Sequence, residues 1–158
     1  MSKSEPIINT EFVQMTRCLV GLPISRPWQG YGTALFTEVG PLTRTYKRTG
    51  HAKADFGLDF GHCWRVEGQR SILFGSSSGR QKIHNGIESL NGLKIIDITT
   101  PGRLPELCVR LSDGRWIHSF ATSEGRPEWS VFLNDGSWLT VKRNRIRKMS
   151  QRDYDLMA

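Results

Sequence analysis

Cysteine and histidine are scarce in this sequence, and neither is spaced like a metal site. The 158 residues contain three cysteines, Cys18, Cys63 and Cys108, and four scattered histidines. An odd number of widely spaced cysteines does not fit a disulfide framework, and zinc sites need ligands at short, regular spacing. We therefore expect no metal, no cofactor and a reduced, cytoplasmic setting.

Long apolar segments are also missing. The longest uncharged apolar stretch, residues 18–24, is far shorter than the roughly 20 residues that a membrane helix needs. Residues 1–6 lack the apolar segment of a signal peptide. The sequence therefore predicts no contact with a membrane.

What the chain does contain is enough apolar surface for a core and an excess of positive charge. A hydrophobic content of 37% with five tryptophans argues against a disordered chain, and the length fits one domain. Lys and Arg number 22 against 15 Asp and Glu, which gives a net charge of +7. This charge admits nucleic acid, an acidic protein or an anionic surface as a partner.

Two similar segments organise the C-terminal half. Residues 105–117 and 127–139 match in register, and each places Asp-Gly between apolar-rich runs. Asp-Gly is a strong hairpin signal because the tight turn needs residues that tolerate positive φ. We predict two successive hairpins that form a four-stranded antiparallel meander. Three tryptophans are expected to help fill its core: Trp116, Trp129 and Trp138.

Alternation of side chains predicts further strands. In residues 54–61, Ala, Phe, Leu and Phe alternate with Asp, Gly, Asp and Gly, which is the period of a half-buried strand. Similar runs predict strands at 33–39, 64–67, 71–74 and 93–98. The expected fold class is mainly β: one antiparallel domain, as a curled sheet, barrel-like or a sandwich, with at most one or two short helices.

Three parts of the chain are expected to differ in character: a flexible tail at 1–8, a β-rich domain at 9–141 and a basic C-terminal arm at 142–158. A short helix capped by Asn9 or Thr10 competes with a strand at 13–20, and residues 81–90 give no clear pattern. The glycines and prolines of 21–32 predict a loop, and 41–53 reads as a basic connector.

Patterns that resemble catalytic sites are weak. Residues 75–79 match the G-x-S-x-G motif with Ser77 in the nucleophile position, but that motif works on a strand-to-helix turn over a parallel sheet. Cys63 follows His62, yet a nucleophilic cysteine needs a histidine close in space. Asp55 and Asp59 would lie about 13 Å apart on one strand, too far for a pair of acid and base. A small hydrolase at Ser77 or Cys63 is the least favoured alternative, and we expect no enzyme.

Several short motifs together carry a resemblance. They are Gly21-Leu22-Pro23, Arg26-Pro27-Trp28-Gln29-Gly30-Tyr31-Gly32, Leu73-Phe74-Gly75-Ser76-Ser77 and Pro127-Glu128-Trp129-Ser130. Over roughly residues 20–140 the chain resembles a group of small, uncharacterised bacterial proteins. By analogy with small β-rich immunity or antitoxin proteins, the resemblance implies binding to a partner's surface.

Two binding functions follow. The first is a non-enzymatic bacterial protein that acts by protein–protein contact, as an immunity or defence component. The second is a nucleic-acid-binding module that uses the basic arm, since Lys and Arg neutralise phosphates. Aromatic and basic residues are the candidate contacts for either partner: Trp28, Tyr31, Arg44, Lys47, Arg48, Lys142, Arg143, Arg145, Arg147 and Lys148.

Overall fold

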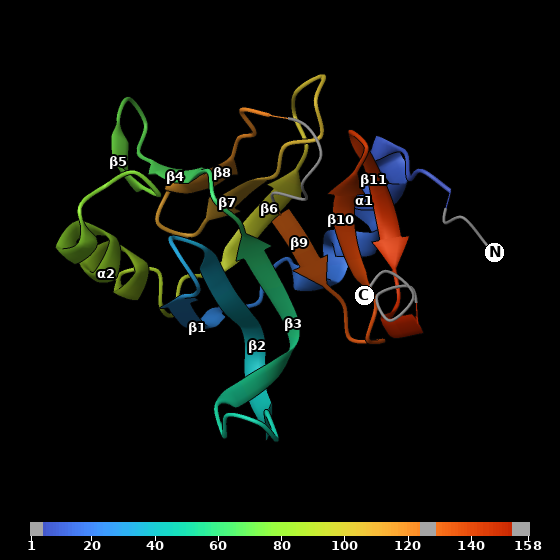
Figure 1. Ribbon diagram of the computed structural model, residues 1–158, viewed down its shortest axis with the longest axis horizontal. Helices are drawn as coiled ribbons and strands as arrows, with labels where there is room; N and C mark the ends of the chain where they lie inside the picture. Colours follow the sequence, from blue (N-terminus) through green and yellow to red (C-terminus); the bar gives the residue numbers. More distant parts are fainter. Residues whose placement is uncertain (1–4, 124–128, 153–158) are drawn as a thin grey trace.

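The computed structural model describes residues 5–123 and 129–152, which form two antiparallel sheets and two α-helices (Figure 1). The mainly β, antiparallel fold class expected from the sequence is confirmed. The larger sheet has six strands in this order: β1 (Ile24–Gln29), β2 (Leu35–Thr45), β3 (Ala52–Phe60), β9 (Trp129–Phe132), β10 (Trp138–Lys142) and β11 (Arg145–Met149). The smaller sheet has five in this order: β5 (Ile72–Gly75), β4 (Trp64–Glu67), β8 (Trp116–Ser119), β7 (Cys108–Leu111) and β6 (Ile95–Thr99).

Helix α1 (Asn9–Thr16) anchors the N-terminal part of the chain to the core. Phe12 on this helix is fully buried, and its ring meets that of Trp129 edge-on at 5.6 Å. The predicted helix is therefore confirmed, and the strand alternative at 13–20 is wrong. The expected cap is also wrong, because Ile8 holds the N-cap position and no side chain caps the helix. A short 3₁₀ turn, Arg17–Leu19, follows it.

Helix α2 (Arg80–Glu88) occupies a segment that gave no clear pattern in the sequence. It buries Ile83 and Ile87, which lie four residues apart and therefore on one face. Only these two positions of the helix are apolar and buried, and they are separated by His84, Asn85 and Gly86. Two apolar residues are too few for the helical period to be recognised in the sequence.

One apolar core joins the two sheets. It includes Leu35 and Leu58 of the larger sheet with Trp64, Val66 and Val109 of the smaller sheet, all of them fully buried. The chain passes from one sheet to the other through the short connection between β3 and β4, visible in Figure 1. Alternate side chains of the larger sheet, such as those of Phe36 and Asp59, point to its opposite face.

Both Asp-Gly hairpins are confirmed, but the continuous meander is wrong. Strands β7 and β8 pair around Gly114 (φ 89°), and β9 and β10 pair around Gly136 (φ 82°). The hairpins belong to different sheets, because β8 pairs with β4 and β9 pairs with β3. Similarity in sequence therefore identified two hairpins correctly without showing how they are joined.

The expected loop at residues 21–32 contains an edge strand. Strand β1 pairs with β2 along its length, and Pro27 lies opposite Thr37. Proline is tolerated at a sheet edge because its missing N–H is not needed there. The expected basic connector at 41–53 is likewise a hairpin, in which β2 continues to Thr45 and β3 begins at Ala52.

Both expected ends of the domain need correction. Ile7, placed in the flexible tail, donates its backbone N–H to the carbonyl of Ile146 at 2.8 Å and packs against the core. Residues 145–149, placed in the basic arm, form β11 and pair with β10. Residues 1–4 and 153–158 of the expected tail and arm lie outside the described residues. In the part of the chain that the structure describes, no helix is long and apolar enough to cross a membrane.

Candidate functional site: a groove on the six-stranded sheet

The face of the larger sheet opposite the core carries a groove with a volume of about 890 Å³. The strand register aligns its side chains in two neighbouring rows across the sheet. The first row reads Arg26, Glu38, Gly57, Phe132, Trp138 and Met149. The second row reads Trp28, Phe36, Asp59, Ser130, Thr140 and Arg147. Neighbouring side chains in a row lie on the same face of adjacent strands, and they are close enough to contact one another.

Aromatic side chains form both walls of the groove. On one side the ring of Trp28 stacks on Phe36 with centroids 5.4 Å apart, and the guanidinium of Arg26 lies 4.4 Å from the Trp28 ring centroid. On the other side Phe132 lies 6.0 Å from Trp138. All four rings are half-buried, so each still presents surface to the groove.

Glu38 is held inside the groove by hydrogen bonds. Only 3% of its surface is exposed. One carboxylate oxygen accepts the hydroxyl of Tyr46 at 2.6 Å, and the other accepts the backbone N–H of Ala54 at 3.1 Å. Burial, followed by this hydrogen bond to Glu38, raises the pKa of Tyr46 above its ordinary value, which keeps the hydroxyl in its donating form.

Asp59 lies diagonally across the strands from Glu38, and its environment favours the neutral carboxyl. Burial raises the pKa of its carboxyl to about 8, and the negative charge of Glu38 adds to this rise. Within residues 5–123 and 129–152, no hydrogen bond or ion pair reaches this side chain. A pKa of about 8 favours the protonated carboxyl of Asp59 at neutral pH, and that form can both donate and accept a hydrogen bond.

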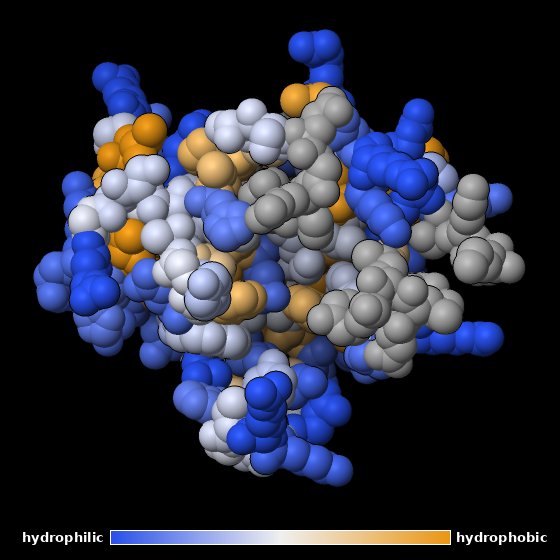
Figure 2. Space-filling model, in the orientation of Figure 1, coloured by the Kyte–Doolittle hydropathy of each residue, from blue (hydrophilic) through white to orange (hydrophobic). Residues whose placement is uncertain are grey.

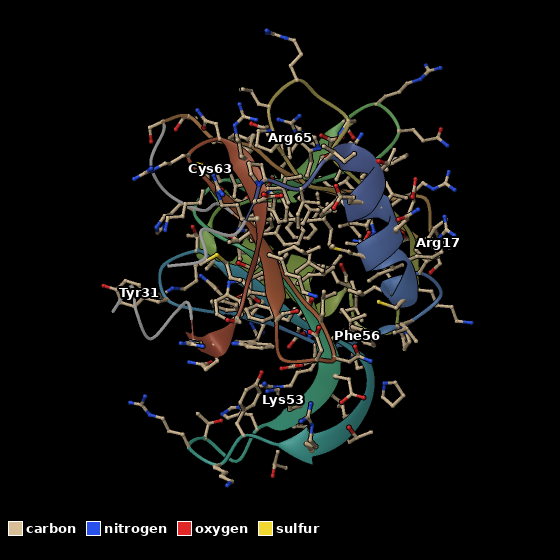
Figure 3. The ribbon with its side chains drawn as sticks, turned by 90° about the vertical axis from the view of Figure 1, so that its right-hand side faces the viewer. Arg17, Tyr31, Lys53, Phe56, Cys63 and Arg65 are labelled. Carbon is tan, nitrogen blue, oxygen red and sulfur yellow. The ribbon has the colours of Figure 1, made fainter. Side chains whose placement is uncertain are left out.

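Basic side chains lie along the side of the groove formed by the β2–β3 hairpin. Lys53 lies 4.8 Å from the centroid of the Tyr46 ring, and Arg44 pairs with Asp55 at 3.1 Å. Arg26 also contacts the imidazole of His51. Figure 3 shows Lys53 on this hairpin, and Figure 2 shows hydrophilic side chains covering it, with apolar ones nearer the centre of the face.

The basic residues near the C-terminus share this face. Ile146 belongs to the core and lies opposite Val141, so the alternate positions Arg145 and Arg147 point to the groove side of the sheet. Lys142 pairs with Arg145 on the same side. Lys148 has the other parity and bonds the Asp135 carboxylate at 3.2 Å, while Arg143 lies in the β10–β11 turn.

The structure thus brings together some of the residues expected to bind a partner and separates others. Trp28 and Arg44 line the groove, whereas Lys47 and Arg48 are exposed at the tip of the β2–β3 hairpin. Tyr31 is 95% exposed in the β1–β2 turn and projects from the body of the molecule (Figure 3). Trp129 is buried as expected, but Trp138 lines the groove and Trp116 is half-buried beneath Arg110, so the core assignment was wrong for these two.

Sequence reasoning missed Glu38 and Asp59 as a pair. They lie 21 residues apart in the chain, and only the register of β2 and β3 makes them neighbours. A prediction that paired β2 with β3 in the correct register would have found them, because Glu38 and Asp59 then lie on the same face of the two strands.

The two residues considered for hydrolysis, Ser77 and Cys63, lie in different connections between elements. Ser77 is exposed in the turn between β5 and α2, where the hydroxyls of Ser76 and Ser78 bond to backbone groups of Trp64 and Gly75. Cys63 is half-buried at the β3–β4 connection. Neither of them lines the groove. Among the described residues, no group of three or more His, Cys, Asp or Glu side chains is arranged to hold a metal.

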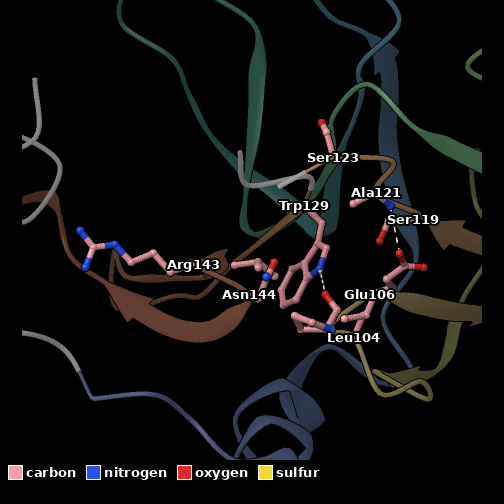
Figure 4. A pocket seen from close by; sticks show the side chains of 10 residues that line it. Leu104, Glu106, Ser119, Ala121, Ser123, Trp129, Arg143 and Asn144 are labelled. Carbon is pink, nitrogen blue, oxygen red and sulfur yellow. Dashed lines mark hydrogen bonds between the residues drawn. The ribbon is translucent and has the colours of Figure 1, made fainter. Parts of the chain in front are cut away.

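A second cavity is much smaller. It measures about 50 Å³ beside Trp129, whose indole N–H donates to the carbonyl of Pro105 at 2.8 Å (Figure 4). Glu106 lines it and accepts the N–H of Ala121 at 2.9 Å. This volume holds only one or a few water molecules, so the groove is the better candidate site.

Comparison of the chain with protein-family models, with curated proteins and with solved structures found no match.

Proposed function

We propose that this protein is a non-enzymatic binding protein that holds single-stranded nucleic acid in the groove of the six-stranded sheet. One observation carries the proposal: basic residues distant in the sequence flank an aromatic groove on a single face. Arg44 and Lys53 lie at the β2–β3 hairpin, and Lys142, Arg145 and Arg147 lie on β10 and β11.

This combination matches how single strands are bound. Phosphates pair with Lys and Arg in a sequence-independent way, and unpaired bases stack on aromatic side chains. Trp28 and Phe36 on one wall, with Phe132 and Trp138 on the other, offer stacking surfaces between the two basic regions. The volume of about 890 Å³ is in the range of about 300–1,000 Å³ that small-ligand pockets span. Duplex would not expose its bases to these rings.

Acidic groups in the groove do not oppose this proposal strongly. Asp59 is protonated at neutral pH, and Asp55 is paired with Arg44. Glu38 is almost fully buried and hydrogen-bonded. The exposed charge that approaching phosphates meet is therefore mainly basic.

A salt titration tests the proposal. Fluorescence anisotropy measures the binding of labelled single-stranded RNA, single-stranded DNA and duplex DNA to nuclease-treated protein at several salt concentrations. We expect single strands to bind more tightly than duplex, with an affinity that falls steeply as salt rises. If no oligonucleotide binds near physiological salt, the proposal is wrong.

Two pairs of substitutions locate the contact. Lys142→Gln with Arg145→Gln removes two charges from the groove face, and we expect weaker binding with a smaller salt slope. Arg80→Gln with Lys82→Gln removes the same charge from α2, where both side chains are exposed and neither lines the groove. Equal loss in both variants would show a general charge effect and contradict binding in the groove.

A protein partner is the second candidate, as for an immunity or antitoxin-like protein. Its supporting observation is Tyr31, an aromatic side chain that is 95% exposed. Tyrosine is enriched among residues that dominate protein interfaces. Tyr31→Ala would weaken binding to a protein partner, and it lies outside the groove, so it separates the two candidates.

A further inference from the structure

The centre of the groove is a gap in the sheet face at Gly57. Its neighbours across the strands are Glu38 on β2 and Phe132 on β9. A side chain begun at this glycine would meet the carbonyl oxygen of Thr37 at 3.0 Å and the Phe132 ring at 3.6 Å. Glycine thus leaves a space bordered by a carboxylate on one side and an aromatic ring on the other.

Asp59 borders the same space. It follows Gly57 by two residues on the same face, and its neighbour Ser130 lies across the strands on β9. The space at Gly57 is therefore bordered by Glu38 on β2, by Asp59 two residues along β3, and by Phe132 on β9, whose ring lies 6.0 Å from that of Trp138. A flat ligand that stacks on the rings would present its edge to the carboxyl groups.

The hydrogen-bonding capacity of this edge is mainly that of an acceptor. Each carboxyl oxygen can accept two hydrogen bonds, and each oxygen of Glu38 already accepts one from the protein. The protonated Asp59 adds one donor and further acceptor capacity. A ligand that fits must supply N–H donors, together with one acceptor opposite Asp59.

We infer that this central space recognises a nucleobase that carries an exocyclic amino group, read by Glu38 and Asp59. Cytosine and adenine each place an amino donor next to a ring-nitrogen acceptor, and carboxylates accept from the amino group of cytosine in known complexes. Uracil and thymine present a carbonyl oxygen there, which would face the negative charge of Glu38. This inference rests on the proposed function, because it names which base the groove prefers within a bound single strand.

Hydrogen bonds to a base edge and stacking alone predict different preferences among the bases. Stacking on aromatic rings tolerates every base, so it alone gives little sequence preference. Hydrogen bonds to base edges give preference, and one well-made pair discriminates by roughly tenfold or more. A preference for cytosine over uracil that depends on Asp59 would therefore identify the carboxyl pair as the reading element.

The test compares oligo(C) with oligo(U) of equal length at one low salt concentration and pH 7. We expect the wild-type protein to bind oligo(C) about tenfold more tightly. Asp59→Leu should bring the two affinities to within about twofold, whereas Asp59→Asn, which keeps a donor and an acceptor, should retain most of the preference. Asp97→Leu on β6 of the other sheet is the matched control and should keep the full preference.

The outcomes separate the two proposals. Equal binding of oligo(C) and oligo(U) by the wild-type protein overturns the base preference and leaves nucleic-acid binding standing. Failure to bind either oligonucleotide overturns both. Because the wild-type comparison needs no substitution, the inference stays testable even if Asp59→Leu does not fold, and a thermal melt of each variant reports on that.

Discussion

Glu38 and Asp59 are diagonal neighbours on adjacent strands of the six-stranded sheet: Glu38 faces Gly57, and Asp59 follows Gly57 by two residues. Such diagonal positions lie about 7–8 Å apart, close enough for two carboxyl groups to repel each other inside a protein. Two hydrogen bonds stabilise the negative charge of Glu38, and the raised pKa of Asp59 favours its neutral form, which reduces the repulsion. The arrangement stores an unused hydrogen-bonding group at the centre of the groove.

The first prediction concerns stability and pH at Asp59. Its folded-state pKa of about 8 exceeds the ordinary value of 3.8. Between these values the folded protein keeps a proton that the unfolded chain has lost, so the free energy of unfolding falls as pH rises from about 4 to about 8. Asp59→Asn has no titratable group at this position, so its free energy of unfolding should fall less over the same pH range. Thermal melts of both proteins at pH 5 and pH 8 measure it.

The comparison between the two proteins isolates Asp59 from the rest of the groove. The other titratable and charged groups that line it are common to both: Arg26, Glu38, Arg44, Tyr46, His51, Lys53 and Asp55. Their contributions to the pH dependence therefore largely cancel in the difference between the two melting temperatures. A difference that stays constant between pH 5 and pH 8 would mean that Asp59 ionises normally in the folded protein.

The second prediction concerns the hydrogen bonds of Glu38. Glu38→Ala would leave the buried N–H of Ala54 and the hydroxyl of Tyr46 without their acceptor. An unsatisfied buried group costs about 1–3 kcal/mol, so we expect a loss in this range in chemical denaturation. Tyr46→Phe is the milder comparison, because it removes one donor and leaves Glu38 bonded to Ala54. A loss in Glu38→Ala no larger than in Tyr46→Phe would contradict a role for both bonds.

Local chemistry explains which elements could be predicted from the sequence. The Asp-Gly turns were identifiable because Gly114 and Gly136 adopt positive φ, which few other residues tolerate. Strand β1 was hidden because Pro23, Pro27 and Gly30 are typical of a loop, and only the position at a sheet edge makes Pro27 compatible with a strand. Local signals identify turns well, and they do not show which strand lies at an edge.

The candidate site depended on contacts that local signals do not contain. The sequence marks Trp28 and Arg44 as candidates because they are an aromatic and a basic residue on expected loops. They line the groove because β1, β2 and β3 pair in one register. Glu38 was unremarkable as one polar residue in a strand. Its importance comes from Tyr46 and Ala54, which reach it through the fold of the hairpin.

The third prediction concerns the two hairpin glycines. Gly114→Val and Gly136→Val place a β-branched side chain where φ is 89° and 82°. No atom lies within 4 Å of the added Cβ at either position, so any effect comes from the backbone conformation and not from a clash. We expect each substitution to cost about 1–2 kcal/mol or more in the free energy of unfolding. Gly79→Val, which also has open space but a φ of −62°, is the control, and an equal loss there would refute the explanation.

The last prediction concerns the aromatic walls. If bases stack in the groove, Trp28→Ala and Trp138→Ala should each weaken the binding of single-stranded oligonucleotides by about fivefold or more, since a stacked base contributes roughly 1–3 kcal/mol. Trp116→Ala is the matched control, because Trp116 is also half-buried but belongs to the five-stranded sheet. Intrinsic fluorescence offers a second measurement: Trp28→Phe or Trp138→Phe should reduce the quenching caused by an oligonucleotide, and Trp116→Phe should not. Equal effects at all three tryptophans would show that the strand binds elsewhere, and the basic residues of β10 and β11 would then need another explanation.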